Sequence, residues 1–237
     1  METEKLFLKD SYLKECDSKA VTVEFTDLTV DKTVFYPTSY GQQNDKGEIE
    51  IEGKKYSIVD VWEDGQLVHL ISLDTYPQNL DGVNIHQSID WNIRYNHMRY
   101  RTALFIIGGL AFKFYNAKSR ISQTYENYAW IDIYIDNIKQ DIIDRLIDET
   151  NRIIKQNLPV EIKYADNNEF SIDKQMFGFS TGSIPQDEKL RVVNISGLPL
   201  QADYGLHVKS TGEIGTVEFK TSMVKGKLDK RLTITLK

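Results

Sequence analysis

The sequence has almost no cysteine. Cys16 is the only one among 237 residues, which excludes an internal disulfide framework and a zinc site built from several cysteines of one chain. A single thiol is also typical of a protein in a reducing compartment. The first ten residues, METEKLFLKD, are charged from the second residue onward and do not resemble a signal peptide. These features predict a cytoplasmic protein.

Long hydrophobic runs and an excess of positive charge are also missing. The longest apolar stretch, ALFIIGGLAF at 103–112, is too short to span a bilayer. The formal net charge is −6, which argues against bulk electrostatic attraction to nucleic acid. A local basic segment is nevertheless present at 220–231, and its cations are Lys220, Lys225, Lys227, Lys230 and Arg231. That segment is either a nucleic-acid contact or a solvated hairpin turn.

The first part of the chain has the alternating pattern of β-strands. VTVEFTDLTV at 21–30 alternates apolar and polar residues, which predicts one half-buried strand. The stretch 49–71 predicts strands joined by turns at 52–54 and 63–66, each with a glycine that tolerates positive φ. A further short strand is predicted at 83–89.

The second part changes to helical periodicity. Residues 92–115 are apolar nearly all round, which predicts a buried helix. Residues 137–158 place isoleucine and leucine on one stripe, which predicts an amphipathic helix ended by Pro159. Strands are predicted at 128–136, 160–166, 190–196, 214–223 and 231–237. Because helices and strands are segregated rather than alternating, the fold class is α+β.

Taken alone, the residues contain no strong catalytic motif. The chain has four histidines, which are His69, His86, His97 and His207. No two of them have the sequence spacing of a metal-binding pair. Asp203 lies four residues before His207 in a predicted loop. The two residues are either a pair of metal ligands or part of an ordinary hydrogen-bonded turn. The loop 40–47 either binds a polar ligand through backbone N–H groups and Gln42 or only connects strands. The residues alone therefore indicate a soluble α+β protein, and a polar cleft is one of the two interpretations of its loops.

Four stretches of the chain share the order and spacing of a known family. They are TVFYPTSYGQQNDKG (33–47), DWNIRYNHMRYRTALFIIGGL (90–110), RVVNISGLPLQADYGLHVKSTGEIG (191–215) and KGKLDKRLTI (225–234). They resemble the patterns YPxSGGQPxDxG, DWxRRxxHMRxHTAxHLL, RVVxIxGxxxxxCGGTHVxxTxEIG and KGKxxxRI of the AlaX proteins. These proteins are free-standing relatives of the editing domain of alanyl-tRNA synthetase. The agreement extends over nearly the whole chain.

The resemblance implies a fold, an activity and a partner. The fold is an N-terminal β-barrel-like domain at 1–82, followed at 83–237 by an α+β editing-type domain with two main helices packed on an antiparallel sheet. The activity is hydrolysis of serine or glycine from wrongly charged alanine tRNA. Carried over from the family, Gln42 is a substrate-binding residue, with Thr38 or Ser39 beside it. A tRNA partner would in addition be contacted by the basic segment, through Lys225, Lys227 and Arg231.

The zinc site of the family is altered in this sequence. Family members hold zinc with HxxxH on the helix and CxxxH on the later loop, and these positions here carry Arg101, Phe105, Asp203 and His207. Arginine offers no lone pair at neutral pH and phenylalanine has none. Zinc sites normally use three or four protein ligands. We therefore expect no metal cofactor, and a surviving zinc site is the alternative.

A salt bridge is a physical substitute for the metal. We expect Arg101 and Asp203 to lie within ion-pair distance and join helix to loop, and Phe105 to fill the metal's volume. Simple decay of the site is the alternative. Without zinc, the groups left to position water and polarise the ester are Arg101, His207 and Gln42. Of these, Arg101 and His207 are the expected catalytic residues, and the arginine could stabilise an oxyanion.

Three functions remain open from the sequence. The first is an aminoacyl-tRNA deacylase with weak or zinc-independent activity. The second is a catalytically inactive module that binds tRNA, a small molecule or a protein partner. The third is an enzyme that uses the altered pocket on a different small substrate.

Overall fold

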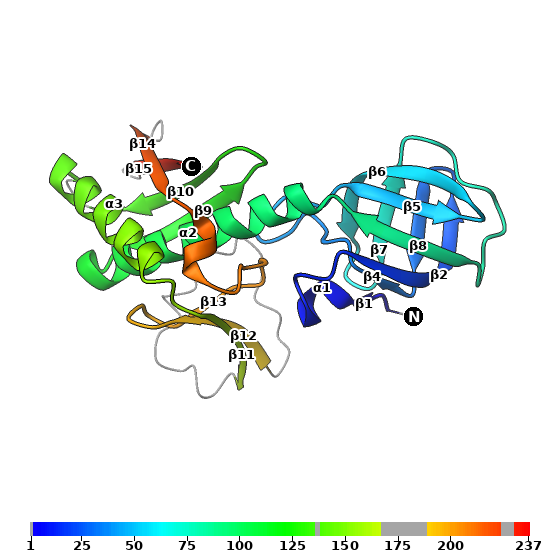
Figure 1. Ribbon diagram of the computed structural model, residues 1–237, viewed down its shortest axis with the longest axis horizontal. Coiled ribbons are helices and arrows are strands. Elements are labelled where there is room, and N and C mark those ends of the chain that lie inside the picture. Colours follow the sequence, from blue (N-terminus) through cyan, green and yellow to red (C-terminus); the bar gives the residue numbers. More distant parts are fainter. Residues whose placement is uncertain (1, 136–137, 167–188, 224–229) are drawn as a thin grey trace. The chain divides into compact units, whose positions relative to one another are not determined.

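The computed structural model describes residues 2–135, 138–166, 189–223 and 230–237 (Figure 1). The chain divides into two compact units. Unit 1 comprises the residues up to Ser39 together with Gln43–Tyr95, and unit 2 comprises Tyr40–Gln42 and Asn96–Lys237. The mixture of helices and sheets confirms the predicted α+β class.

Unit 1 contains a closed six-stranded barrel. Its strands are β2 (Glu15–Glu24), β3 (Asp27–Val30), β5 (Gly47–Ile51), β6 (Lys54–Glu63), β7 (Val68–Ser72) and β8 (Asn84–Ile89). They follow the order β2-β3-β7-β6-β5-β8, and every neighbouring pair is antiparallel. Outside the barrel lie α1 (Leu6–Lys9) and the parallel pair β1 (Glu4–Lys5) and β4 (Lys32–Thr33). Alternate inward side chains such as Leu28, Val61 and Leu70 are fully buried and fill the interior.

The prediction of one strand over residues 21–30 is wrong. β2 ends at Glu24, and β3 begins at Asp27 and pairs with it antiparallel, so this stretch is a hairpin. Phe25 has a φ of 52° and is 70% exposed, as expected at the tip of a tight turn. An aromatic side chain in an alternating stretch indicates one more half-buried strand residue, and this is why the turn is not visible in the sequence pattern.

The barrel extends beyond the domain boundary placed between residues 82 and 83. β8 pairs with β2 on one side and with β5 on the other, and so closes the barrel. Unit 1 therefore continues to Tyr95 and includes the first residues of the long helix α2 (Trp91–Tyr115). Strand pairing between distant segments, rather than a local change in composition, sets this limit.

Unit 2 contains two sheets. The four-stranded antiparallel sheet has the order β14-β15-β10-β9, and the three-stranded antiparallel sheet has the order β11-β12-β13. The strands are β9 (Lys118–Thr124), β10 (Ala129–Tyr134), β11 (Val160–Asp166), β12 (Lys189–Ile195), β13 (Gln201–Ala202), β14 (Val217–Met223) and β15 (Lys230–Leu236). A short 3-10 helix, η1 (Thr211–Ile214), precedes β14.

The two predicted long helices are both present, as α2 and as α3 (Gln140–Lys155). The side-chain amide of Asn151 on α3 donates to the Val217 carbonyl at 3.0 Å and accepts from the Val217 N–H at 2.9 Å, which fastens α3 to β14. Along α2, a Cβ at Gly109 would lie 2.9 Å from Gln201 Nε2, so glycine permits close packing there. None of the described helices combines the length and apolar character needed for a membrane span.

Candidate functional site

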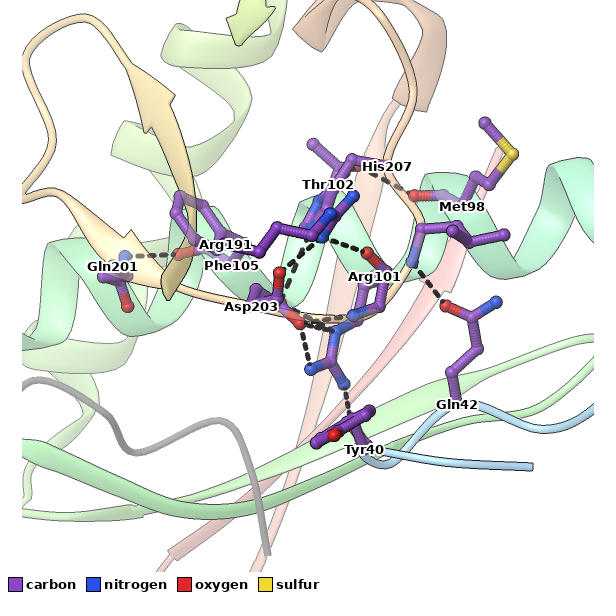
Figure 2. A network of polar contacts seen from close by, with 12 residues as sticks. Tyr40, Gln42, Met98, Arg101, Thr102, Phe105, Arg191, Gln201, Asp203 and His207 are labelled. Atoms are coloured by element: carbon purple, nitrogen blue, oxygen red, sulfur yellow. Dashed lines mark hydrogen bonds and ion pairs between the residues drawn. The ribbon is translucent and has the colours of Figure 1, made fainter. Parts of the chain in front are cut away.

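Arg101 on α2 and Asp203, which follows β13, form a buried ion pair (Figure 2). Arg101 Nε donates to Asp203 Oδ2 at 2.8 Å and Oδ1 at 3.1 Å, and Arg101 Nη2 donates to Oδ1 at 2.5 Å. Both side chains are 0% exposed. The predicted ion pair is therefore confirmed, and it joins two segments that are 102 residues apart in the chain.

Arg101 also contacts a third segment. Its Nη1 donates to the carbonyl oxygen of Tyr40 at 2.6 Å. A Cβ at position 205 would lie 2.6 Å from Arg101 Nε, so only glycine leaves room for the arginine there. Arg191 on β12 donates through Nη1 to the Gly205 carbonyl at 2.9 Å and also bonds the Asp203 carbonyl. Two buried arginines thus shape the backbone at 203–205.

His207 lies against the same carboxylate. Its Nε2 is 3.3 Å from Asp203 Oδ2, and its Nδ1 is 3.2 Å from Thr102 Oγ1. Burial lowers the pKa of His207, although Asp203 acts in the opposite direction. Burial alone would raise the pKa of Asp203, but the charge of Arg101 and the hydrogen bonds from His207 and Arg101 hold it below its usual range. At neutral pH the group therefore contains one cation, one anion and a neutral imidazole.

Phe105 lies one turn after Arg101 on α2 and is fully buried. Its ring meets the His207 ring edge to face, with centroids 5.4 Å apart and an interplanar angle of 79°. The backbone carbonyl of Phe105 is 3.5 Å from Gln201 Nε2. Phe105 thus fills space beside His207, and its occupation of a former metal volume stays a prediction.

These four residues do not fit a zinc ion. The carboxylate of Asp203 is engaged by Arg101, and His207 Nε2 faces that carboxylate. Phe105 has no lone pair to donate. Within the part of the chain that the structure describes, no group of three or more His, Cys, Asp or Glu side chains could hold a metal. The donor set disagrees with the zinc that the family resemblance implies, since zinc needs three or four such ligands.

Of the three predicted binding residues in the loop, Thr38, Ser39 and Gln42, Gln42 is the one that lies in unit 2. It forms a parallel β-bridge with Thr124. Its Oε1 accepts from the Leu206 N–H at 2.9 Å, which is the dashed line at Gln42 in Figure 2. Gln42 is 0% exposed, and its Nε2 has no hydrogen-bond partner within the described residues. Ser122 lies two residues before Thr124 on β9 and is 3% exposed, and its Oγ also lacks a partner among those residues. A buried polar atom without a partner in the protein can be satisfied by a bound water or ligand, so Gln42 and Ser122 are candidates for a polar site.

Thr38 and Ser39 belong to unit 1. Thr38 Oγ1 donates to Asn44 Oδ1 at 3.0 Å, and Ser39 Oγ donates to Tyr36 Oη at 2.9 Å. Their hydroxyl groups therefore bond within the loop that carries them. The structure groups Gln42, Arg101 and His207 in unit 2 and does not group these two residues with them.

The predicted tRNA contacts can be located only in part. Arg231 on β15 makes a two-point ion pair with Asp132, Nε to Oδ1 at 2.7 Å and Nη2 to Oδ2 at 2.8 Å. Its guanidinium also lies 3.6 Å from the ring centre of Trp130. Lys225 and Lys227 lie outside the described residues. Arg231 is thus engaged by neighbouring strand residues.

Sequence reasoning missed several residues that shape the structure around these groups. In unit 1, Arg94 donates through Nε to Asp45 Oδ1 at 2.9 Å, and both side chains are fully buried. In unit 2, Arg191 and Ser122 were also not singled out. The available signal was a charged or polar residue on an otherwise apolar helix or strand. Such a residue needs a buried partner, but the sequence does not say which one.

The chain is similar over its full length to alanyl-tRNA editing proteins. It is 34% identical over 242 residues to the alanyl-tRNA editing protein AlaX-M of Saccharolobus solfataricus, covering 99% of both chains. It is 29% identical over 244 residues to AlaX-M of Methanosarcina acetivorans, again over 99% of both chains. The alanine–tRNA ligase of Aeropyrum pernix is 30% identical over 218 residues, which are 90% of this chain and 24% of the ligase. No family model matches the sequence.

Proposed function

The chain belongs to the AlaX family of alanyl-tRNA editing proteins, and on that basis we propose that it hydrolyses serine or glycine from wrongly charged alanine tRNA without using zinc. In this reaction water cleaves the ester, releasing the free amino acid and leaving a hydroxyl group on the terminal ribose. The tRNA is the partner, and the cytoplasm is the compartment in which we expect the reaction.

The observation that carries the proposal is the buried amide of Gln42. A buried polar group without a partner costs about 1–3 kcal/mol, and a bound acceptor would remove that cost. Because Nε2 is a donor, the group that it suits is an oxygen, such as a substrate carbonyl or hydroxyl. Ser122 Oγ adds a second hydroxyl that can donate or accept. A seryl ester carries both kinds of oxygen.

Arg101 and His207 have a different part in this proposal from the catalytic one expected from the sequence. Arg101 is fully buried, and its Nε, Nη1 and Nη2 all donate to Asp203 or to the Tyr40 carbonyl. We therefore assign it a positioning role, since it holds the segment that carries Gln42 against α2. His207 is held between Thr102 and Asp203 and orients the later loop in the same way.

The zinc-independent part of the proposal rests on the same contacts. A zinc ion would join the helix to the loop through its ligands, and here an ion pair makes that connection. Two-point arginine–carboxylate bonding also fixes relative orientation, as metal coordination does. Asp203 receives a further hydrogen bond from the Gly205 N–H at 2.8 Å, so the carboxylate is satisfied without a metal.

Binding without hydrolysis is the second candidate function. It is favoured by the burial of Arg101, Asp203 and His207, each at most 4% exposed. Groups that are buried and bonded to one another are poorly placed to transfer protons to a substrate. In that case the polar site at Gln42 would bind an aminoacyl group without cleaving it.

A deacylation assay separates the two functions. Seryl-, glycyl- and alanyl-tRNA(Ala) are incubated with protein before and after treatment with EDTA, and the loss of amino acid is followed. We expect faster loss of serine and glycine than of alanine, unchanged by EDTA. Gln42→Ala should abolish the acceleration, whereas Gln66→Ala, at an exposed turn residue, should not. Binding of charged tRNA with no acceleration would favour the second function.

A further inference from the structure

Two tyrosine rings stack beside the ion pair. The ring centroids of Tyr40 and Tyr204 are 5.0 Å apart, and the interplanar angle is 25°. The carbonyl of Tyr40 accepts from Arg101 Nη1, and Tyr204 directly follows Asp203 in the chain. Arg101 and Asp203 are fully buried, whereas both tyrosines are partly exposed. The aromatic pair is therefore the part of this group that a solute can reach.

The backbone of Tyr40 is held in an unfavourable conformation. Its φ of 47° lies in the left-handed region, which glycine adopts freely and residues with a Cβ usually avoid. Gly41 follows with a φ of 76°. The AlaX pattern has glycine at the positions of both Tyr40 and Tyr204, so the stacked pair is a departure of this chain from that pattern. An outlier of this kind in a non-glycine residue motivates the hypothesis that its side chain has a role.

We propose that the Tyr40–Tyr204 pair is a stacking surface for a nucleobase, the adenine at the 3′ end of the tRNA. The proposal rests on the proposed function, because that substrate carries its amino acid on the ribose of the same terminal nucleotide. Tyr40 lies two residues before Gln42, which we assign to the acyl group. A base and an acyl group on one ribose can therefore lie against neighbouring residues of the same segment.

The chemistry of the pair favours a base over other parts of a tRNA. Stacked phenol rings present a flat π surface, and every base has a complementary π face. The nearby cation, Arg101, is buried and engaged with Asp203, so it does not provide an exposed phosphate site. The Tyr40 carbonyl is held by Arg101, which pre-orders the segment that carries the ring and lowers the entropy lost on binding.

The test measures binding of adenosine 5′-monophosphate by calorimetry, with ribose 5-phosphate as the ligand that lacks a base. Tyr204→Leu should weaken binding of the nucleotide by about tenfold, the loss expected when one aromatic–base stack is removed. Tyr204→Phe keeps the ring and should bind within about twofold of wild type. Tyr164→Leu, at a 57% exposed tyrosine on β11, is the matched control and should bind like wild type. Ribose 5-phosphate should bind much more weakly than the nucleotide to every variant.

Two results would overturn the proposal. One is failure of the wild type to bind the nucleotide, and the other is equal binding by wild type and Tyr204→Leu. A lower melting temperature in Tyr204→Leu with unchanged binding would show that the stack only fastens two segments. If Tyr204→Leu does not fold, photo-crosslinking of wild type with 8-azidoadenosine monophosphate decides, because attachment must map to Tyr40 or Tyr204.

The same measurements separate this proposal from the proposed function. Nucleotide binding that depends on Tyr204, without hydrolysis of seryl-tRNA by wild type, would support the base site and refute the hydrolase. Hydrolysis by wild type, with nucleotide binding that does not depend on Tyr204, would support the hydrolase and refute the base site. With active protein, Tyr204→Leu should raise KM for seryl-tRNA and leave kcat unchanged, because the base is bound equally in the ground state and the transition state.

Discussion

Replacement of Asp203 by asparagine tests the buried ion pair directly. The substitution keeps the size of the side chain but leaves the Arg101 charge buried without its counterion. Asp203 accepts hydrogen bonds from Arg101 Nε, Arg101 Nη2 and the Gly205 N–H, and both charged side chains are 0% exposed. Removing one partner of such a pair destabilises a protein by about 3–5 kcal/mol.

The expected change in melting temperature follows from this free energy. A destabilisation of 1 kcal/mol lowers the melting temperature of a domain of this size by about 2–4 °C, so Asp203→Asn should lower it by roughly 6–20 °C. Differential scanning calorimetry of the whole chain measures this change. The paired substitution Arg101→Met with Asp203→Leu removes both charges and should recover most of the loss, because apolar replacement of a whole buried pair is often neutral.

Asp17→Asn is the matched control. Asp17 is 85% exposed in its pair with His86, at a distance of 2.8 Å, so its replacement should cost less than about 1 kcal/mol. An Asp203→Asn variant no less stable than this control would refute the argument that the ion pair replaces a metal as the connection between α2 and the loop. Loss of stability in the paired substitution as large as in Asp203→Asn would instead assign the effect to packing.

Three further outcomes are expected. The pKa of His207 is lowered from 6.5, so the imidazole binds a proton more readily in the unfolded state than in the folded state. Chemical denaturation should therefore show that the free energy of unfolding falls as the pH drops below about 6.5. His207→Gln should flatten this part of the pH–stability profile. Gly205→Ala places a Cβ 2.6 Å from Arg101 Nε and should cost about 1–3 kcal/mol; an unchanged denaturation midpoint would contradict this close approach. Elemental mass spectrometry of the purified wild-type protein should find no zinc, and zinc there would contradict the metal-free proposal. A triple variant with Arg101→His, Phe105→His and Asp203→Cys should bind about one zinc ion per chain.

Local patterns predicted most of the regular structure. The buried helix over residues 92–115 and the amphipathic helix within 137–158 both occur, because hydrophobic periodicity reports directly on which side chains face the core. The hairpin at Phe25 was missed because its aromatic tip carries the same signal as a strand residue. The closure of the barrel by β8 was missed because pairing between distant strands leaves no local mark.

The ion pair was predictable for a specific reason. In the AlaX pattern, the positions of Arg101 and Asp203 are ligands of one zinc ion, so the resemblance predicts that they are close in the fold. Arginine and aspartate at these positions have opposite charges and can form an ion pair. Sequence alone could therefore anticipate the contact between Arg101 and Asp203. It could not anticipate that Arg101 would be fully buried, since exposure depends on everything packed around a side chain.

By itself, the sequence determined the α+β class and the family, because these depend on residue types and their spacing. Only the tertiary structure decided which polar atoms lack partners, as at Gln42 and Ser122. It also decided that Tyr40 and Tyr204 stack, though they are far apart in the chain. Such features depend on the relative placement of side chains from several segments, and that placement exists only once the core has packed.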